Sequence, residues 1–237
     1  MARGVVMRWL GIGVALLAGL GSARAAEKPV VLELFTSLAC SSCPPADRLL
    51  SRLAREPGVL ALDLHVTYWN GLGWPDPYSL MAATARQVMY QNRFHLAELY
   101  TPQLVVNGVR QVVGSDAAAV RRALAAVRAA VARHPPVRLS LARTAGGMVA
   151  RIGPGRGPAM LWRVGYDERR VTAVGGGENA GRRLAETDVV REISPAASWM
   201  GAASTFVLAR PAGQRAAVFL AAPDGRILAA ATLARKD

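Results

Sequence analysis

Cysteine and histidine, residues that commonly form metal and redox sites, are scarce in this chain of 237 residues, which has two cysteines and three histidines. The two cysteines are Cys40 and Cys43, so a disulfide within the chain has to join them. A closed zinc site needs about four ligands, and only His65, His95 and His134 accompany the cysteines. We therefore predict neither a metal site nor a cofactor.

Blocks of basic residues are also missing, although the formal net charge is +13. The cationic residues are nearly all arginine and are dispersed in singles and pairs, such as Arg121-Arg122 and Arg182-Arg183, without interleaved aromatic residues. A nucleic-acid surface usually shows a clustered basic patch and a recognition motif. We therefore predict no nucleic-acid partner, while a basic surface still favours acidic partners or anionic lipid.

The apolar stretch near the start of the chain, residues 10–20, is too short to span a bilayer, which needs about 20 residues. Arg3 and Arg8 provide a positive start, and Ala23-Arg24-Ala25 provides a small-x-small cleavage site, which is the pattern of a secretory signal peptide. No cysteine directly follows the apolar stretch, so we expect no lipid-modified N-terminus. We predict a signal peptide over residues 1–25 and a periplasmic or secreted protein without stable membrane insertion after cleavage; the alternative is an uncleaved anchor.

The two cysteines stand as Cys40-Ser41-Ser42-Cys43, directly after the apolar run Val30–Phe35. Two sulfurs at this spacing near a helix start lie on one face, close enough to form and break a disulfide. A bridge that closes so short a loop removes little chain entropy from the unfolded state, so it stabilises the fold poorly. We therefore predict a redox-active pair, in a protein exported to a compartment where disulfides persist. The alternative is an inert or permanently oxidised pair.

The residues before Pro135 alternate between strand and helix patterns. Short apolar runs predict strands, and apolar residues at helical spacing predict helices. Asn107-Gly108 is a strong hairpin signal, and Ser115 or Asp116 can cap the last helix. The predicted order, a compact α/β plan, is strand 30–35, helix 46–55, strand 59–68, helix 79–99, strand 103–106, strand 109–113 and helix 117–133.

His134-Pro135-Pro136 ends the last of these helices, because proline biases the preceding residue away from helix, and we place a domain boundary there. The short strand-like segments that follow are separated by glycine and proline. They predict a smaller, mostly-β C-terminal domain over residues 137–237, built as an antiparallel sandwich or half-barrel. Its predicted strands are 137–141, 148–152, 160–166, 205–209, 216–221 and 227–232.

Residues 29–133 resemble the thioredoxin superfamily. The resemblance rests on a strand that ends at Phe35, on Cys40-Ser41-Ser42-Cys43 opening a helix, and on Thr101-Pro102 just before the hairpin strand. The fold class that we expect is therefore α/β, with a thioredoxin-like domain over residues 29–133 followed by the mostly-β domain.

The chain more closely resembles a bacterial family of exported thioredoxin-like proteins that is catalogued as a domain of unknown function. No activity is assigned to that family. As a set, the matching segments are more specific than the Cys-x-x-Cys spacing alone. They are residues 33–37, 40–47, 65–66, 68–69, 73–74, 100–103, 106–108, 177–182 and 189–191.

The resemblance implies catalytic roles for three residues. Cys40 would be the nucleophile, at a helix N-terminus whose dipole and free N–H groups stabilise a thiolate. Cys43 would be shielded one turn further on and would resolve the mixed disulfide. Pro102 would take the cis form and face the cysteines, whereas the sequence alone favours trans, since only about 5–6% of X–Pro bonds in folded proteins are cis.

Several neighbouring residues have two open interpretations. Glu33 is either a proton acceptor beneath the cysteines or a structural acid with a partner. His65, on the same strand face as Asp63, is either a structural histidine or a redox tuner or metal ligand. The aromatic residues form either a packed corner or a substrate-facing surface; they are Tyr68, Trp69, Trp74 and Tyr78.

Two further features bear on the reactivity of the cysteines. The hydroxyls of Ser41 and Ser42 can donate hydrogen bonds to a thiolate, which would stabilise the reduced form. Pro44-Pro45 removes two N–H groups from the first turn, so we expect the helix to begin late and its dipole to act more weakly on the sulfur.

We predict an exported thiol–disulfide oxidoreductase in which Cys40 and Cys43 act on protein thiols or disulfides. One alternative is a soft-metal carrier, in which the two thiolates and His65 bind Cu(I). The other is a redox-silent thioredoxin-like binding module. The sequence leaves open the direction of electron flow, the client and recycling partner, the oligomeric state and the role of the C-terminal region.

Overall fold

The computed structural model describes residue 1, residues 29–133 and residues 137–233. Apart from residue 1, the predicted signal peptide lies outside the described residues, and so does the predicted domain boundary at residues 134–136. Among the described residues, no helix is long and apolar enough to cross a membrane.

The first half of the chain has the predicted thioredoxin-like plan. β1 pairs in parallel with β2 and antiparallel with β3, which forms a hairpin with β4. Asn107 and Gly108, with φ of 51° and 68°, make the predicted turn of that hairpin. The elements are β1 (Val30–Thr36), α1 (Pro44–Leu53), β2 (Val59–His65), the 3₁₀ helix η1 (Tyr68–Leu72), α2 (Met81–Phe94), β3 (Gln103–Val106), β4 (Arg110–Val113) and α3 (Ala117–Arg133).

The second half consists of strands and extends the same sheet. Its elements are β5 (Leu139–Thr144), β6 (Gly147–Ile152), β7 (Ala159–Ala173), β8 (Arg183–Trp199), β9 (Ser204–Leu208), β10 (Arg215–Ala221) and β11 (Ile227–Thr232). Eight strands form one sheet in the order β11-β10-β7-β8-β2-β1-β3-β4, and β5, β6 and β9 form a second sheet. The two halves meet where β8 runs parallel to β2, with Asp63 opposite Val189.

The α/β fold class is confirmed, but the expected split into a separate C-terminal sandwich is not. Two sheets do share a core in this half, because Met148 and Ile152 of β6 pack with Leu161 of β7 and Val218 of β10. One of these layers is, however, the continuation of the thioredoxin-like sheet. The sequence analysis also missed β8, which is the strand that makes this connection.

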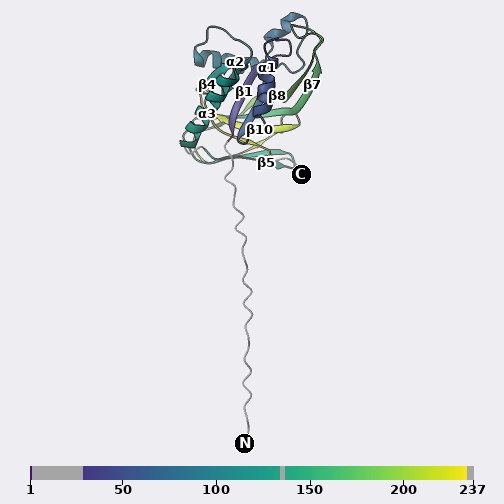
Figure 1. Cartoon of the computed structure of the whole chain (residues 1–237). Helices are drawn as coiled ribbons and strands as arrows, with labels where there is room; N and C mark the ends of the chain where they lie inside the picture. Colours follow the sequence, from purple (N-terminus) through teal and green to yellow (C-terminus); the bar gives the residue numbers. More distant parts are fainter. Residues whose placement is uncertain (2–28, 134–136, 234–237) are drawn as a thin grey trace.

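Helices cover both faces of the large sheet (Figure 1). On one face, α2 packs on a core that runs without a break from β1 and β2 to β7 and β10. On the other face, α1 and α3 pack on β1, β2 and β3. β1 is therefore buried along its whole length, which explains why its sequence is a nearly continuous apolar run.

Glu33 is the exception in that run, and its carboxylate has partners from α2. Arg86 binds it through two nitrogens, and Tyr90 donates a third hydrogen bond. The guanidinium group of Arg86 also stacks on Trp162 of β7 and Phe219 of β10, with 4.9 and 4.7 Å to the ring centres. Of the two interpretations of Glu33, the structure therefore supports the structural acid with a partner. Because Arg86 contacts both Glu33 of β1 and the rings of β7 and β10, this ion pair links the two halves of the sheet.

Replacing Arg86 with methionine should lower the free energy of unfolding by about 3–5 kcal/mol, because it leaves the buried Glu33 carboxylate without its cation. Urea unfolding measures this loss. The double variant Glu33→Gln/Arg86→Met should regain part of it, since it removes the uncompensated charge. A loss below about 1 kcal/mol for the single variant, the size expected of an exposed pair, would contradict this account.

Candidate functional site

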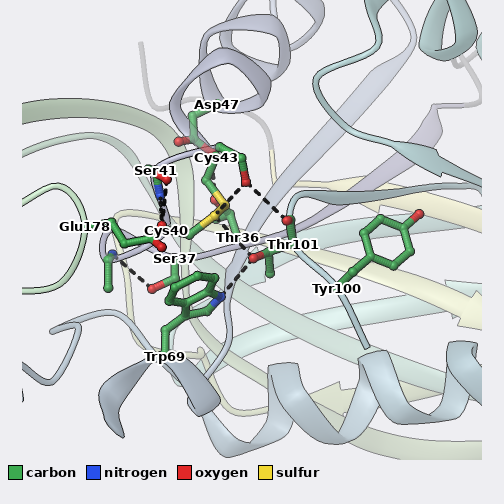
Figure 2. Close-up of a disulfide and its surroundings, with 12 residues drawn as sticks. Thr36, Ser37, Cys40, Ser41, Cys43, Asp47, Trp69, Tyr100, Thr101 and Glu178 are labelled. Atoms are coloured by element: carbon green, nitrogen blue, oxygen red, sulfur yellow. Dashed lines mark hydrogen bonds between the residues drawn. A yellow bond between two sulfur atoms is a disulfide. The ribbon is translucent and has the colours of Figure 1, made fainter. Parts of the chain in front are cut away.

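A disulfide joins Cys40 and Cys43 where the chain passes from β1 into α1, with their Cα atoms 5.5 Å apart (Figure 2). Both cysteines are 0% exposed, whereas Ser41 and Ser42 between them are exposed. The bridge therefore lies directly beneath the surface of the described protein.

The start of α1 differs from the sequence-based expectation. The helix begins at Pro44 with Cys43 as its N-cap, so Cys40 precedes the helix by a full turn. The two prolines have no N–H group, and the N–H groups of Ala46 and Asp47 both bind the carbonyl of Cys43. The free N–H groups expected to stabilise a Cys40 thiolate are thus absent from the first turn of this helix.

Side-chain hydroxyl groups contact Cys40 instead. The hydroxyl of Thr101 donates a hydrogen bond of 3.3 Å to Cys40 Sγ, and the hydroxyl of Ser42 lies 3.3 Å from the same sulfur. The indole N–H of Trp69 donates to the Thr101 hydroxyl at 2.8 Å, which orients that group toward the sulfur (Figure 2). The Thr101–Pro102 peptide bond is cis, the form that the resemblance implies.

The loop between β7 and β8, residues 174–182, covers the disulfide from the other side. The carboxylate of Glu178 accepts hydrogen bonds from the backbone N–H and the hydroxyl of Ser41, at 2.8 and 2.6 Å (Figure 2). The bond from the hydroxyl and then that from the N–H hold the pKa of Glu178 below its usual value. We call residues 174–182 the cap.

Asn179 and Gly177 fix the cap against the chain that leads to the cysteines. The side-chain amide of Asn179, fully buried, donates to the carbonyl oxygens of Leu38 and Cys40 at 3.0 and 2.7 Å. Gly177 has φ of +71°, and a Cβ there would lie 2.6 Å from Cβ of Ala39. This position therefore requires glycine, both for its conformation and for its close approach.

Two of the four aromatic residues form the packed corner, which is one of the two interpretations. Trp74 and Tyr78 pack with Leu38, Val174 and Leu184, so they form the packed corner beneath the cap. Trp69 is partly buried and contacts the site through Thr101, as described above. Tyr68 is 41% exposed and follows the strand that ends beside the disulfide.

Asp76 ties the chain before Cys40 to His65. One oxygen of its buried carboxylate accepts hydrogen bonds from the N–H of Leu38 at 2.8 Å and from Nδ1 of His65 at 2.7 Å, and it lies 3.3 Å from the donating hydroxyl of Ser37. Burial alone would raise the pKa of Asp76, but the charge and hydrogen bond of His65 hold it below its usual value.

Further acids surround His65 beneath the disulfide. Its Nε2 lies 3.8 Å from the carboxylate of Asp63 and 3.5 Å from that of Glu186. Burial raises the pKa of Asp63 above its usual value and the pKa of Glu186 to about 8. Burial, and then the charges of Asp63 and Glu186, raise the pKa of Asp47, whose carboxylate accepts a hydrogen bond from Thr36 at 2.9 Å.

The structure thus brings together the three residues predicted to be catalytic and places Glu33 elsewhere. Both ring nitrogens of His65 face carboxylates rather than the sulfurs. Sequence reasoning missed the roles of Asn179 and Glu178, although the segment 177–182 was among those that resemble the family. It also missed Glu186, because the strand that carries Glu186 was not predicted.

These observations define the chain as a thioredoxin-like protein with a Cys-x-x-Cys disulfide. It belongs to a family described as protein of unknown function (DUF1223), whose model matches residues 31–221.

Three known proteins are similar to the chain. A protein of Agrobacterium tumefaciens, solved in a structural genomics programme, has a TM-score of 0.75 and 27% sequence identity, over 88% of this chain and 96% of that one. HBP35 of Porphyromonas gingivalis has a TM-score of 0.57 and 16% identity, over 86% of this chain and 74% of that one, which shows the fold alone. A probable thioredoxin of Archaeoglobus fulgidus is 46% identical over 43 residues, which are 18% of this chain and about half (47%) of that protein.

The contacts of Asn179 predict that the cap controls access to the disulfide. Replacing Asn179 with alanine leaves two buried carbonyl groups without their donor, at a cost of roughly 1–3 kcal/mol. If the whole of this cost falls on closure of the cap, dithiothreitol should reduce the native variant roughly 5- to 150-fold faster than the wild type. Stopped-flow mixing followed by thiol alkylation measures the rate.

Asn92→Ala, which changes an exposed asparagine of α2, is the matched control and should leave the reduction rate unchanged. An Asn179→Ala variant reduced no faster than the wild type would show that the cap does not limit access.

Proposed function

We propose that this protein is an exported thiol–disulfide oxidoreductase that acts on protein thiols or disulfides through Cys40 and Cys43. The observation that carries the proposal is the disulfide itself, placed beside Thr101-Pro102 with two hydroxyl groups at the sulfur of Cys40. Hydroxyl groups directed at one sulfur stabilise a thiolate there and so favour cleavage of the bond.

The reaction transfers two electrons and two protons. A substrate thiolate attacks Sγ of Cys40, the Cys40–Cys43 bond breaks, and Cys43 leaves as a thiolate that takes up a proton. A second substrate thiolate then attacks the substrate sulfur of the mixed disulfide and releases Cys40. The substrate ends as a disulfide and the protein as a dithiol; the reverse sequence reduces a substrate disulfide.

The two sulfurs differ in a way that supports their assigned roles. In the described part of the chain, the hydrogen bonds to the sulfurs both fall on Cys40, and the exposed residues Ser41 and Ser42 follow it. Cys43 is the N-cap of α1, and its sulfur accepts neither of these two hydrogen bonds. These features favour Cys40 as the sulfur that meets the substrate and Cys43 as the resolving sulfur.

The geometry is less favourable to the copper-carrier alternative. Binding of Cu(I) would need His65 as a third ligand beside the two thiolates. His65 instead donates from Nδ1 to Asp76 at 2.7 Å and directs Nε2 toward Asp63 and Glu186. A thiolate site of this kind would require the ring to leave three buried carboxylates.

A single-cysteine variant should trap the reaction intermediate. With Cys43 replaced by serine, Cys40 can attack a peptide disulfide but the mixed disulfide cannot resolve. We expect a covalent adduct of one peptide half per chain that dithiothreitol releases, measured by intact-protein mass spectrometry.

Cys40→Ser is the matched control, because it keeps one thiol in the same motif, and it should form at least tenfold less adduct. If both native variants fail to form an adduct while unfolded Cys43→Ser does, the pair is redox-silent and the proposal is wrong.

A further inference from the structure

Three buried side chains meet at the junction of β2 and β8, beneath the disulfide. Asp63 and His65 lie two residues apart on β2 and hence on one face of the strand, and Glu186 comes from β8. One nitrogen or oxygen atom of each lies within 4.8 Å of the other two. Their side chains are 0–1% exposed.

These side chains carry most of the unpartnered polar atoms of the described protein. Nine buried side-chain atoms in that part of the chain lack a hydrogen-bond partner, and five of them belong to this group: both carboxylate oxygens of Asp63, both of Glu186, and Nε2 of His65. Leaving a buried polar atom without a partner costs folding free energy, and the cost is larger when the atom is charged. Five such atoms facing one another therefore indicate a ligand that the protein chain does not itself provide.

The separations between these atoms suit a metal ion better than direct hydrogen bonds. Nε2 of His65 lies 3.8 and 3.5 Å from the nearest oxygens of Asp63 and Glu186, whereas hydrogen bonds of this kind are about 2.7–3.2 Å long. Ligands that bind one ion tetrahedrally at about 2.0–2.2 Å lie about 3.3–3.6 Å apart. Small movements of the carboxylates would bring all three groups to a shared ion.

Asp76 holds His65 in the orientation that a metal ligand needs. Its carboxylate accepts the Nδ1 proton at 2.7 Å, so Nε2 is the ring nitrogen that faces Asp63 and Glu186. A metal ion that binds there displaces the Nε2 proton of the charged ring. Metal-binding histidines almost always donate their second ring nitrogen to a carboxylate or carbonyl group in this way. The ring also packs edge-on against Tyr78, with 5.4 Å between the ring centres, which restricts its rotation.

We propose that Asp63, His65 and Glu186 bind a divalent first-row transition-metal ion. One imidazole nitrogen with carboxylate oxygens is a donor set that Zn²⁺ and Mn²⁺ accept. Such an ion offsets the charge of the buried carboxylates and fastens β8 to β2. Through Asp76 it also steadies Leu38 and so the chain that leads to Cys40.

The test uses the full-length protein with its disulfide closed, so that the sulfurs cannot act as ligands. Because the site is buried, the protein is unfolded in guanidinium chloride with a chelator and refolded with an excess of Zn²⁺, Mn²⁺ or Mg²⁺. Desalted samples are then analysed by inductively coupled plasma mass spectrometry. We expect about one Zn²⁺ or Mn²⁺ per chain and less than a tenth of that for Mg²⁺. Free metal at about 100 times Kd should raise Tm by roughly 5–10 °C.

Three variants locate the ion. Asp63→Asn/Glu186→Gln removes both carboxylate ligands while keeping their volume, and should lose at least nine-tenths of the bound metal. This variant relieves charge repulsion in the metal-free protein, so it is expected to fold. Asp167→Asn changes a buried acid of β7 and is the matched control; Cys40→Ser/Cys43→Ser removes the sulfurs. Both of these should keep the metal.

The proposal is overturned if the refolded wild type holds less than a tenth of an equivalent of both Zn²⁺ and Mn²⁺, or if the Asp63→Asn/Glu186→Gln protein holds as much metal as the wild type. It is overturned as well if the folded Cys40→Ser/Cys43→Ser protein binds no metal, because the ion would then depend on the disulfide rather than on Asp63, His65 and Glu186 alone. None of these outcomes depends on whether the disulfide is redox-active.

Discussion

The parallel pairing of β8 with β2 is the contact on which the rest of the structure depends. It is narrow, since the register places one residue pair, Asp63 and Val189, side by side. Yet it joins four C-terminal strands to the thioredoxin-like sheet and brings two elements to the disulfide. The cap that precedes β8 covers the cysteines from above, and Glu186 of β8 reaches the ring of His65 below them.

The disulfide thus lies between a polar cover and a buried layer of acids. Above the disulfide, Asn179 donates a hydrogen bond to the carbonyl group of Cys40, and Glu178 accepts one from the backbone N–H of Ser41. Below it, Asp76 binds the same loop through the N–H of Leu38. Buried carboxylates cost folding free energy unless they are compensated, and in this layer His65 is the cation that faces Asp63, Asp76 and Glu186. The loop that carries Cys40 is therefore held from both sides.

The sequence was sufficient for the thioredoxin-like half and insufficient for the way the second half joins it. The strand 103–106, the hairpin turn at Asn107-Gly108 and the helix 117–133 were predicted with the bounds that the structure has. These elements have local signals: a short apolar run, a turn that needs positive φ, and apolar residues at helical spacing. β8 has none, because its 17 residues include charged side chains and Pro195, so its strand conformation comes from pairing with β7 along its length. The acids near His65 converge only through that pairing.

We propose that this covered disulfide opens and closes under biological conditions. The most direct measurement is an equilibrium titration of the native protein in glutathione and dithiothreitol buffers, with alkylation of free thiols and intact-mass detection. The account predicts a reversible two-electron transition between about −270 and −120 mV, the range of thioredoxin-like oxidoreductases. A pair that stays fully oxidised across that range, and becomes reducible only when the protein unfolds, would contradict it.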